Sequence, residues 1–223
     1  MAQSLLNEKA KVFLNSRSAD RLELSVKELR AHGGVLADLT QENEAQRATL
    51  EAIKKMNGLD ILVMNTGGPN KGSFADITNE QWHLDFQNLW MSFIEAVKEV
   101  LPVMKSQKYG RILLITSLAA KEPLANLTTS NGLRAGLAGL CKSLANEVAA
   151  DGITVNVLLP GYTATDRLKE LSLSEEKIKQ MVPAGRLGDP QELASLASFL
   201  ASPLAGYITG QSIAVDGGVL RGH

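Results

Sequence analysis

Hydrophobic and polar positions along this chain form two alternating patterns. Short apolar runs, typical of strands buried on both faces of a parallel sheet, lie at residues 11–15, 35–37, 59–64, 111–116, 153–159 and 212–215. Amphipathic stretches that predict helices lie at about 18–30, 42–56, 79–106 and 128–150, with two short helices before the last strand. This βα alternation predicts one α/β domain over residues 1–223, a doubly wound parallel sheet with helices on both faces.

The start of the pattern departs from that architecture. The chain begins inside its first predicted helix and reaches its first strand only at Lys11. A doubly wound fold opens with a strand and a glycine-rich turn before this helix, so we expect that strand and turn to be missing. The strand lies centrally in the sheet, so its absence would leave two ladders of backbone groups unpaired. We expect the chain to rearrange, to pair its edges with a second copy, or to hold its first 55 residues loosely.

Candidate functional residues follow from the topology. In doubly wound sheets, ligands bind beyond the carboxyl ends of the strands. The residues that follow predicted strands are Arg17, Asp38, Asn65, Thr66, Gly67, Gly68, Ser117 and residues 160–165. We therefore expect the site to be built from these positions.

Composition narrows the classes of function. The formal net charge is −1, and no run of Lys or Arg forms a basic stripe, which argues against nucleic acids and acidic membranes as partners. No apolar stretch approaches the roughly 20 residues of a membrane span, and the N-terminus lacks a signal-peptide pattern. Cys141 is the single cysteine, so no internal disulfide forms. These features predict a soluble, cytoplasmic protein. We further expect a small-molecule substrate and no metal site.

Five motifs stand in register with the strand alternation. They are Asn65-Thr66-Gly67-Gly68 after a strand, Asn88 in a helix, Ser117 at a strand end, Pro160-Gly161-Tyr162-Thr163-Ala164-Thr165, and Val215-Asp216-Gly217-Gly218. Together they resemble, in order, the N-N-A-G turn, helical asparagine, catalytic serine, P-G-x-x-x-T segment and V-D-G-G of short-chain dehydrogenases/reductases. The resemblance covers nearly the whole chain and is nearest to the 3-oxoacyl-carrier-protein reductase type.

The resemblance implies an oxidoreductase that acts on a carbonyl or hydroxyl substrate with NADP(H). The cofactor-binding positions that it implies are Arg17, Asp38, Asn65, Gly67, Gly68, Pro160, Gly161 and Thr165. Arg17 would suit the 2′-phosphate of NADP or be a solvated loop residue, and Asp38 would meet adenine or cap the following helix. Gly67 and Gly68 would allow the backbone to approach the ligand closely, or they would be required by the conformation of the turn, and both can hold together. The glycine turn expected to be missing supplies most of the pyrophosphate contact in this fold, which weakens the case for the cofactor.

The proton-transfer pair departs from the family. Alignment of residues 139–145 with the family's G-L-x-K-S-L-A places Ser130 and Arg134 where the catalytic tyrosine and lysine stand. Serine is a much poorer acid than tyrosine, and arginine does not readily release a proton. The resemblance then implies impaired or atypical chemistry. In it Ser117 polarises a carbonyl, Asn88 holds a relay water, and Arg134 positions ribose or an acidic substrate group. Ser130 would pass a proton only through water, which leaves Tyr162 as the one tyrosine placed to replace the donor.

Two other functions remain open from the residues alone. Ser117 or Ser130 could act as the nucleophile of an esterase, with Arg134 assisting the oxyanion. The chain has three histidines (His32, His83 and His223), and none stands in the evident order of a hydrolase triad. The loss of the tyrosine, the lysine and the glycine turn would also suit a non-catalytic binding protein.

The family also implies an assembly. Its members usually form dimers or tetramers through their two long helices, here residues 79–106 and 128–150. We therefore expect a homodimer or a homotetramer.

Overall fold

The strands of the protein form two parallel sheets. The computed structural model describes residues 1–165 and 174–222. Within these residues, β1 (Phe13–Ser16) pairs with β2 (Gly33–Leu36), and a second sheet has the order β3-β4-β5-β6. The strands of the second sheet are β3 (Ile61–Met64), β4 (Gly110–Ile115), β5 (Ile153–Pro160) and β6 (Ser212–Val215). All pairs are parallel, which confirms the predicted α/β architecture.

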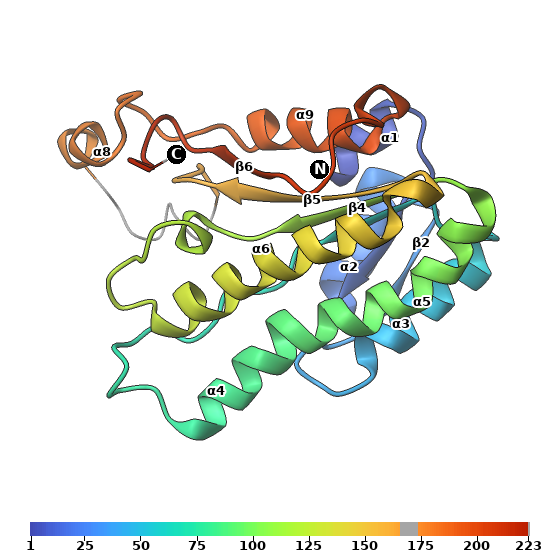
Figure 1. The fold of residues 1–223 in the computed structure, drawn as a ribbon, viewed down its shortest axis with the longest axis horizontal. Coiled ribbons are helices and arrows are strands. Elements are labelled where there is room, and N and C mark those ends of the chain that lie inside the picture. Colours follow the sequence, from blue (N-terminus) through green and yellow to red (C-terminus); the bar gives the residue numbers. More distant parts are fainter. Residues whose placement is uncertain (166–173, 223) are drawn as a thin grey trace.

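Helices cover both faces of the larger sheet. Figure 1 shows α4 (Asn79–Phe86), α5 (Ser92–Gln107) and α6 (Thr128–Val148) on one side of the strands, and α1 (Ala2–Asn7) and α9 (Pro190–Ala201) on the other. The remaining helices are α2 (Ala19–Leu29), α3 (Glu44–Met56) and α8 (Glu175–Met181). No helix within the described residues is long and apolar enough to span a membrane.

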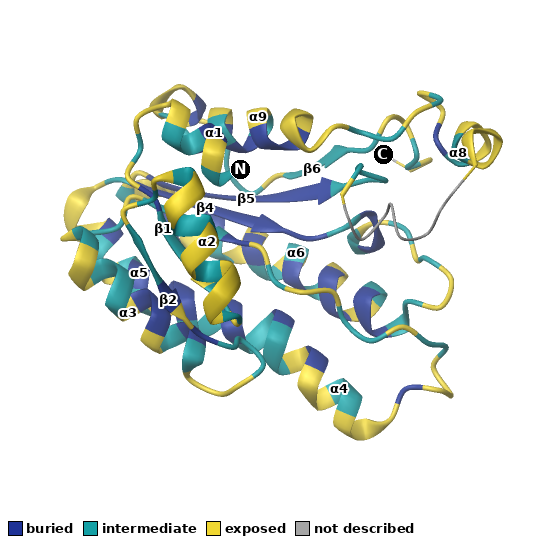
Figure 2. Cartoon of the chain, turned by 180° about the vertical axis from the view of Figure 1, so that it is seen from behind, coloured by how far each residue is buried: buried dark blue, intermediate teal, exposed yellow. Residues whose placement is uncertain are grey.

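The core follows from the strand pattern. All six residues of β4 are buried, and β5 is buried up to its last residue, as the dark blue strands of Figure 2 show. Successive side chains of a strand point to opposite faces. Ile112 and Leu114 of β4 therefore pack with α5 and α6, whereas Leu113 and Ile115 pack with α9.

Local sequence sets the helix starts. Ser18 caps α2 by accepting a hydrogen bond from the Arg21 backbone N–H at 3.4 Å. Asp189 begins α9 with a capping box, in which the Glu192 side chain reaches back to the Asp189 backbone N–H at 2.8 Å. Both arrangements satisfy N–H groups that have no partner inside the helix.

Two sequence predictions of local structure were wrong. The long helix predicted at 79–106 is interrupted by a π-helical segment, Gln87–Met91, between α4 and α5. The strand predicted from residue 35 begins two residues earlier, because Gly33 and Gly34 are the first residues of β2. A Cβ at Gly34 would lie 2.6 Å from the Leu22 side chain of α2, so the glycine allows α2 to approach this strand closely.

The first 56 residues pack onto the rest of the chain through α1, which lies against α9, and through α3. Ala45 of α3 is buried in the same cluster as Phe93 and Ala96 of α5. Gln46 Nε2 also donates a hydrogen bond to Glu99 Oε1 of α5 at 2.6 Å. Within the described residues the two sheets share no ladder, because β1 pairs only with β2 and β3 only with β4.

Candidate functional site

A cavity of about 430 Å³ opens at the carboxyl ends of β3, β4 and β5. Most of its polar lining residues lie in the segments that follow these strands. The other lining residues include Arg134 of α6, Pro190 and Leu193 of α9, and Met1. Its lining residues are Met1, Asn65, Thr66, Gly68, Lys71, Ile115, Thr116, Arg134, Pro160, Gly161, Tyr162, Thr163, Thr165, Pro190 and Leu193. We call this cavity the strand-end cavity. It lies where the doubly wound topology predicted a ligand site.

The turn after β3 is tied to the π-helical segment. Asn88, within that segment, donates a side-chain hydrogen bond to the Gly67 carbonyl at 3.4 Å. A Cβ at Gly67 would meet only Asn88 Nδ2, at 3.8 Å, so packing does not require a glycine here. π-helical segments are frequent at functional sites, and this one directs Asn88 toward the turn. Asn65 and Gly68 of the same turn line the cavity, as predicted, whereas Gly67 does not.

A buried carboxylate holds the next part of this loop. Asp85 of α4 is 3% exposed and accepts hydrogen bonds from the Asn70 backbone N–H at 3.1 Å and from Asn70 Nδ2 at 2.9 Å. The Asn70 carbonyl in turn accepts a bond from the Thr129 hydroxyl of α6 at 3.3 Å. These contacts place the neighbouring Lys71 in the cavity wall. The sequence did not identify Lys71, Asn70 or Asp85 as parts of the site. Their one sequence signal is that they follow the motif at residues 65–68.

The end of β4 presents Thr116, and not Ser117, to the strand-end cavity. The Thr116 hydroxyl donates a hydrogen bond to the Leu158 carbonyl of β5 at 3.3 Å. Ser117 caps the short helix at 118–120, where its hydroxyl oxygen accepts a bond from the Ala119 backbone N–H at 3.3 Å. The Ser117 hydroxyl is the acceptor in that contact, so it does not donate its own hydrogen there.

The two residues at the altered catalytic positions lie on the buried face of α6. Ser130 and Arg134 are four residues apart, so they share one side of the helix. They are only 4% and 6% exposed. Arg134 lines the strand-end cavity and Ser130 does not. A buried guanidinium therefore supplies a fixed positive charge to the cavity wall.

The segment after β5 is braced by the C-terminal motif. The Gly161 backbone N–H donates to the Val215 carbonyl at 2.9 Å. A Cβ at Gly161 would lie 2.6 Å from the Asp216 Cα. The Asp216 carboxylate accepts hydrogen bonds from the backbone N–H groups of Gly218 and Leu220 at 2.9 and 2.8 Å. The V-D-G-G motif thus supports the strand end, and glycine at 161 is required by the chain that packs against it.

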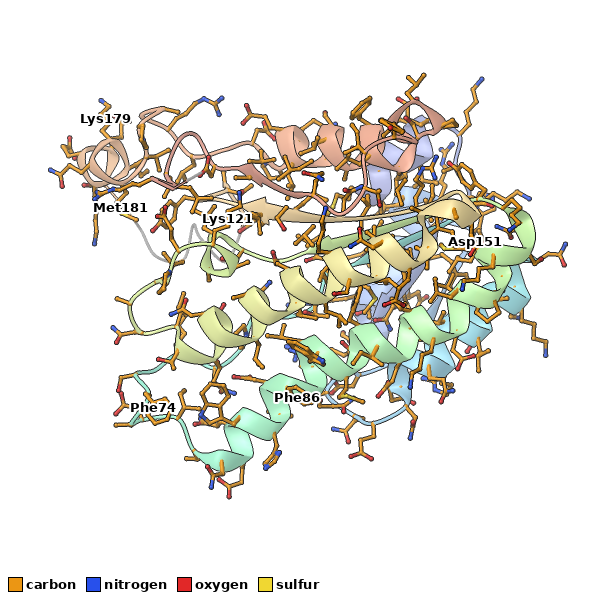
Figure 3. All side chains as sticks on the ribbon, viewed as in Figure 1. Phe74, Phe86, Lys121, Asp151, Lys179 and Met181 are labelled. Carbon is orange, nitrogen blue, oxygen red and sulfur yellow. The ribbon has the colours of Figure 1, made fainter. Side chains whose placement is uncertain are left out.

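Tyr162, the tyrosine predicted to replace the donor, lines the strand-end cavity together with Arg134. The Tyr109 hydroxyl instead donates to the Ala201 carbonyl at 3.2 Å, and the Arg111 guanidinium lies 4.3 Å from its ring centre. This pair lies at the other end of the sheet, the end that Asp151 marks in Figure 3.

Two predicted cofactor residues besides Gly67 lie outside the strand-end cavity. Arg17 is exposed in the turn after β1. The Asp38 carboxylate accepts hydrogen bonds from the Thr40 backbone N–H and hydroxyl at 3.0 and 2.9 Å. Asp38 therefore stabilises a turn before α3, while the residue that precedes this helix is Asn43. The prediction that Asp38 caps the following helix is therefore wrong, because the N-cap of α3 is Asn43.

The described side chains provide no hydrolase base at the strand-end cavity. His32 and His83 are both exposed, and neither lines it. His223 lies outside the described residues. Burial raises the pKa of the Cys141 thiol to about 12, so this side chain is a core residue and not a thiolate nucleophile.

The donors of the cavity suit a nicotinamide cofactor. Its described lining residues include Asn65, Thr116, Arg134 and Thr165, and among them there is no carboxylate. Amide, hydroxyl and guanidinium groups are the types that bind a carboxamide, a ribose or a phosphate. A volume of about 430 Å³ also falls within the usual range of small-molecule sites.

Comparisons with known proteins agree with this arrangement. The family described as Enoyl-(Acyl carrier protein) reductase matches residues 1–220. The NADPH-dependent reductase BacG of Bacillus subtilis is 34% identical over 240 residues, covering 99% of this chain and 92% of that protein. The 3-oxoacyl-[acyl-carrier-protein] reductase FabG of Vibrio cholerae is 35% identical over 222 residues, covering 98% and 91%.

Solved structures show the same fold. The crystal structure of YwfH, an NADPH-dependent reductase involved in bacilysin biosynthesis, matches with a TM-score of 0.94 and 30% identity over 100% of this chain and 93% of the other. An NADPH-bound short-chain oxidoreductase from Pseudomonas aeruginosa PAO1, described as containing an atypical catalytic center, matches with a TM-score of 0.92 and 29% identity over 99% and 91%. The chain therefore belongs to the Enoyl-(Acyl carrier protein) reductase family of short-chain dehydrogenases/reductases.

Proposed function

We propose that the protein is an NADP(H)-dependent oxidoreductase that interconverts a carbonyl and a hydroxyl group in the strand-end cavity, with an atypical proton donor. The observation that carries this proposal is the convergence of three strand ends, buried Arg134 and Tyr162 on one cavity. The similar proteins with NADPH in their names support the choice of cofactor.

Residues of the three strand ends would hold the nicotinamide end of the cofactor. They are Asn65, Gly68, Thr116, Pro160 and Thr165. The bound cofactor supplies or accepts a hydride. Arg17, exposed after β1, is proposed to contact the 2′-phosphate.

Two residues of this chain are proposed to take the roles of the family's catalytic tyrosine and lysine. We assign to Arg134 the stabilisation of negative charge on the substrate oxygen, because its guanidinium is held in the cavity wall and stays protonated. We assign the proton to the Tyr162 hydroxyl, since tyrosine is a stronger acid than serine and Ser130 does not line the cavity. Asn88 positions the β3 turn through the Gly67 carbonyl.

A matched pair of tyrosine variants tests this assignment. With NADPH and a 3-oxoacyl thioester, we expect Tyr162→Phe to lower kcat by about 10²–10⁴-fold, the usual contribution of a general acid. The dissociation constant for NADPH, measured by fluorescence quenching, should stay within about threefold, because the phenol is not needed to hold the cofactor.

The control is Tyr109→Phe, which removes a phenol that contacts the Ala201 carbonyl away from the cavity. It should leave kcat near the wild-type value. Wild-type turnover in Tyr162→Phe would exclude Tyr162 as the donor. Absence of both NADPH binding and turnover in the wild-type protein would exclude the oxidoreductase and leave a non-catalytic binding protein.

A further inference from the structure

Lys71 is the one lysine among the described lining residues of the strand-end cavity. Neither a hydrogen bond nor an ion pair joins its side chain to another described residue. The other charged side chain of this lining is Arg134, and the described lining includes no carboxylate. The wall of the cavity that Lys71 forms is therefore positively charged and can accept a negatively charged group of a ligand.

The backbone on both sides of Lys71 is held in place. Asn70, the preceding residue, is anchored by its hydrogen bonds to α4 and α6. Gly72, the following residue, donates from its backbone N–H to the Asn126 carbonyl at 2.9 Å, and its carbonyl accepts from the Thr128 backbone N–H at 3.4 Å. The Lys71 side chain is exposed, but it starts from a fixed point of the cavity wall.

The carboxylates of the same region bond to other groups. Asp85 accepts from the Asn70 backbone N–H at 3.1 Å and from Asn70 Nδ2 at 2.9 Å. Asp76 accepts from the Ser73 hydroxyl at 2.6 Å and from the Ser73 backbone N–H at 3.1 Å. Neither carboxylate is used to neutralise Lys71, so the charge of the lysine serves no ion pair within the described loop.

The surroundings of Lys71 suit a carboxylate better than a phosphate. Phosphate sites usually supply several free backbone N–H groups. The backbone N–H groups of Asn70 and Gly72 already donate within the protein, to Asp85 and to the Asn126 carbonyl. The single ammonium group of Lys71 matches the single charge of a carboxylate.

The spacing along α6 sets how far this carboxylate lies from the reacting carbonyl. The Thr129 hydroxyl contacts Asn70, the neighbour of Lys71, and Arg134 lies five residues further along the helix. A rise of about 1.5 Å per residue separates these two levels of α6 by about 7–8 Å. The flexible lysine side chain spans part of this distance. A carboxylate and a carbonyl that are a few bonds apart can therefore reach Lys71 and Arg134 together.

We propose that the strand-end cavity selects an oxo acid, a carbonyl compound whose carboxylate binds Lys71 while its carbonyl oxygen meets Arg134. This inference rests on the proposed function, because it takes the reacting oxygen to lie beside Arg134. Lys71 binds the carboxylate equally in the ground state and the transition state, so it lowers KM and leaves kcat nearly unchanged. Carbonyl compounds without a carboxylate remain substrates, with a lower kcat/KM.

A matched pair of substrates, reduced with NADPH, measures this selection. The pair is 4-oxopentanoate and its methyl ester, in which methylene groups separate the ketone from the carboxyl carbon, so both ketones have nearly the same intrinsic reactivity. We expect the wild-type kcat/KM to be at least about fivefold higher for the acid, the upper value for a solvated ion pair. In Lys71→Gln the kcat/KM for the acid should fall to that for the ester through a higher KM.

Two further lysine variants are the controls. Lys71→Arg keeps a positive charge at the same point and should keep most of the preference for the acid. Lys121→Gln removes an exposed lysine, labelled in Figure 3, that does not line the strand-end cavity, and it should keep the full preference. The dissociation constant for NADPH should change little in Lys71→Gln. A loss of NADPH affinity as large as the loss of acid turnover would assign Lys71 to the cofactor and overturn the inference.

Binding without turnover separates this inference from the proposed function. Ligand-observed NMR titration of 4-oxopentanoate, with NADP⁺ and without any cofactor, involves no hydride transfer. We expect the wild-type protein to bind the acid at least about fivefold more tightly than the ester, and Lys71→Gln to lose this difference. If the acid binds in this way but NADPH is not oxidised, the proposed function fails and the carboxylate site stands.

Three results would overturn the inference and leave the oxidoreductase in place. One is an equal kcat/KM of the wild-type protein for the acid and the ester. Another is a preference for the acid that persists unchanged in Lys71→Gln. The third is reduction of a 3-oxoacyl thioester by a protein that binds no 4-oxopentanoate at tens of millimolar.

Discussion

Replacing Gly161 with alanine tests whether this glycine serves the packing of the chain or the approach of a ligand. Gly161 follows β5, and its φ lies outside the left-handed region, so the backbone itself accepts alanine. The new Cβ would lie 2.6 Å from the Cα and 2.8 Å from the Cβ of Asp216. Such separations are shorter than packed carbon atoms tolerate, so the β5 and β6 ends must move apart.

The expected loss of stability follows from two opposing terms. Overpacking costs about 1–3 kcal/mol, and the reduced freedom of alanine in the unfolded chain offsets about 0.4–1 kcal/mol. We expect a net loss of about 1–2 kcal/mol, which lowers the Tm of a domain of this size by about 2–8 °C. Urea unfolding followed by circular dichroism measures this loss, with the slope m unchanged.

The control is Gly139→Ala on α6, where an added Cβ meets nothing within 4 Å. It should stabilise the protein by up to about 1 kcal/mol, because alanine is the better helix former. A Gly161→Ala protein that unfolds at the wild-type urea midpoint but no longer binds NADPH would refute the packing argument. Gly161 would then serve the ligand directly.

Two further predictions concern α6 and α9. A Cβ at Gly136 would lie 2.6 Å from the Trp90 ring, whereas one at Gly132 meets nothing within 4 Å. Gly136→Ala should therefore lower the urea midpoint and Gly132→Ala should raise it, and the reverse order would contradict the packing of α6 on this ring. The hydrogen bonds of the Arg186 guanidinium lower the pKa of Glu192 from 4.5 to about 2. The stability from this pair is present above pH 4.5 and is lost as the pH falls through about 2. The Tm difference between wild type and Glu192→Gln should therefore shrink below pH 4.5 and vanish only below pH 2. A Tm difference independent of pH would exclude the ion pair as its source.

The larger elements were predictable because their signals are strong. The apolar run that became β4 lacks alternation because both of its faces are buried, and the strand at Ser212–Val215 was predicted with the bounds observed. The π-helical segment around Asn88 was not predictable, because its five residues, Gln87–Met91, include no proline or glycine that would mark an irregular turn.

The site was predictable only in part. Motif residues such as Asn65 and Thr165 line the strand-end cavity, because topology alone brings strand ends together. Which side chain of a strand end faces the cavity depends on register, and Thr116 takes the place expected for Ser117. The Asn70–Asp85 contact joins residues fifteen positions apart through a loop whose path no periodic pattern describes.

We propose that a hydride passes between NADP(H) and a carbonyl carbon in the strand-end cavity. The most direct measurement is a reaction with NADPH that carries deuterium at both C4 positions of the nicotinamide ring and a 3-oxoacyl thioester, followed by mass spectrometry of the product alcohol. We predict one deuterium on the carbinol carbon, formed by the wild-type protein at least about 100-fold faster than by Tyr162→Phe. An unlabelled product, or none while the protein is folded and saturated with NADPH, would contradict the claim.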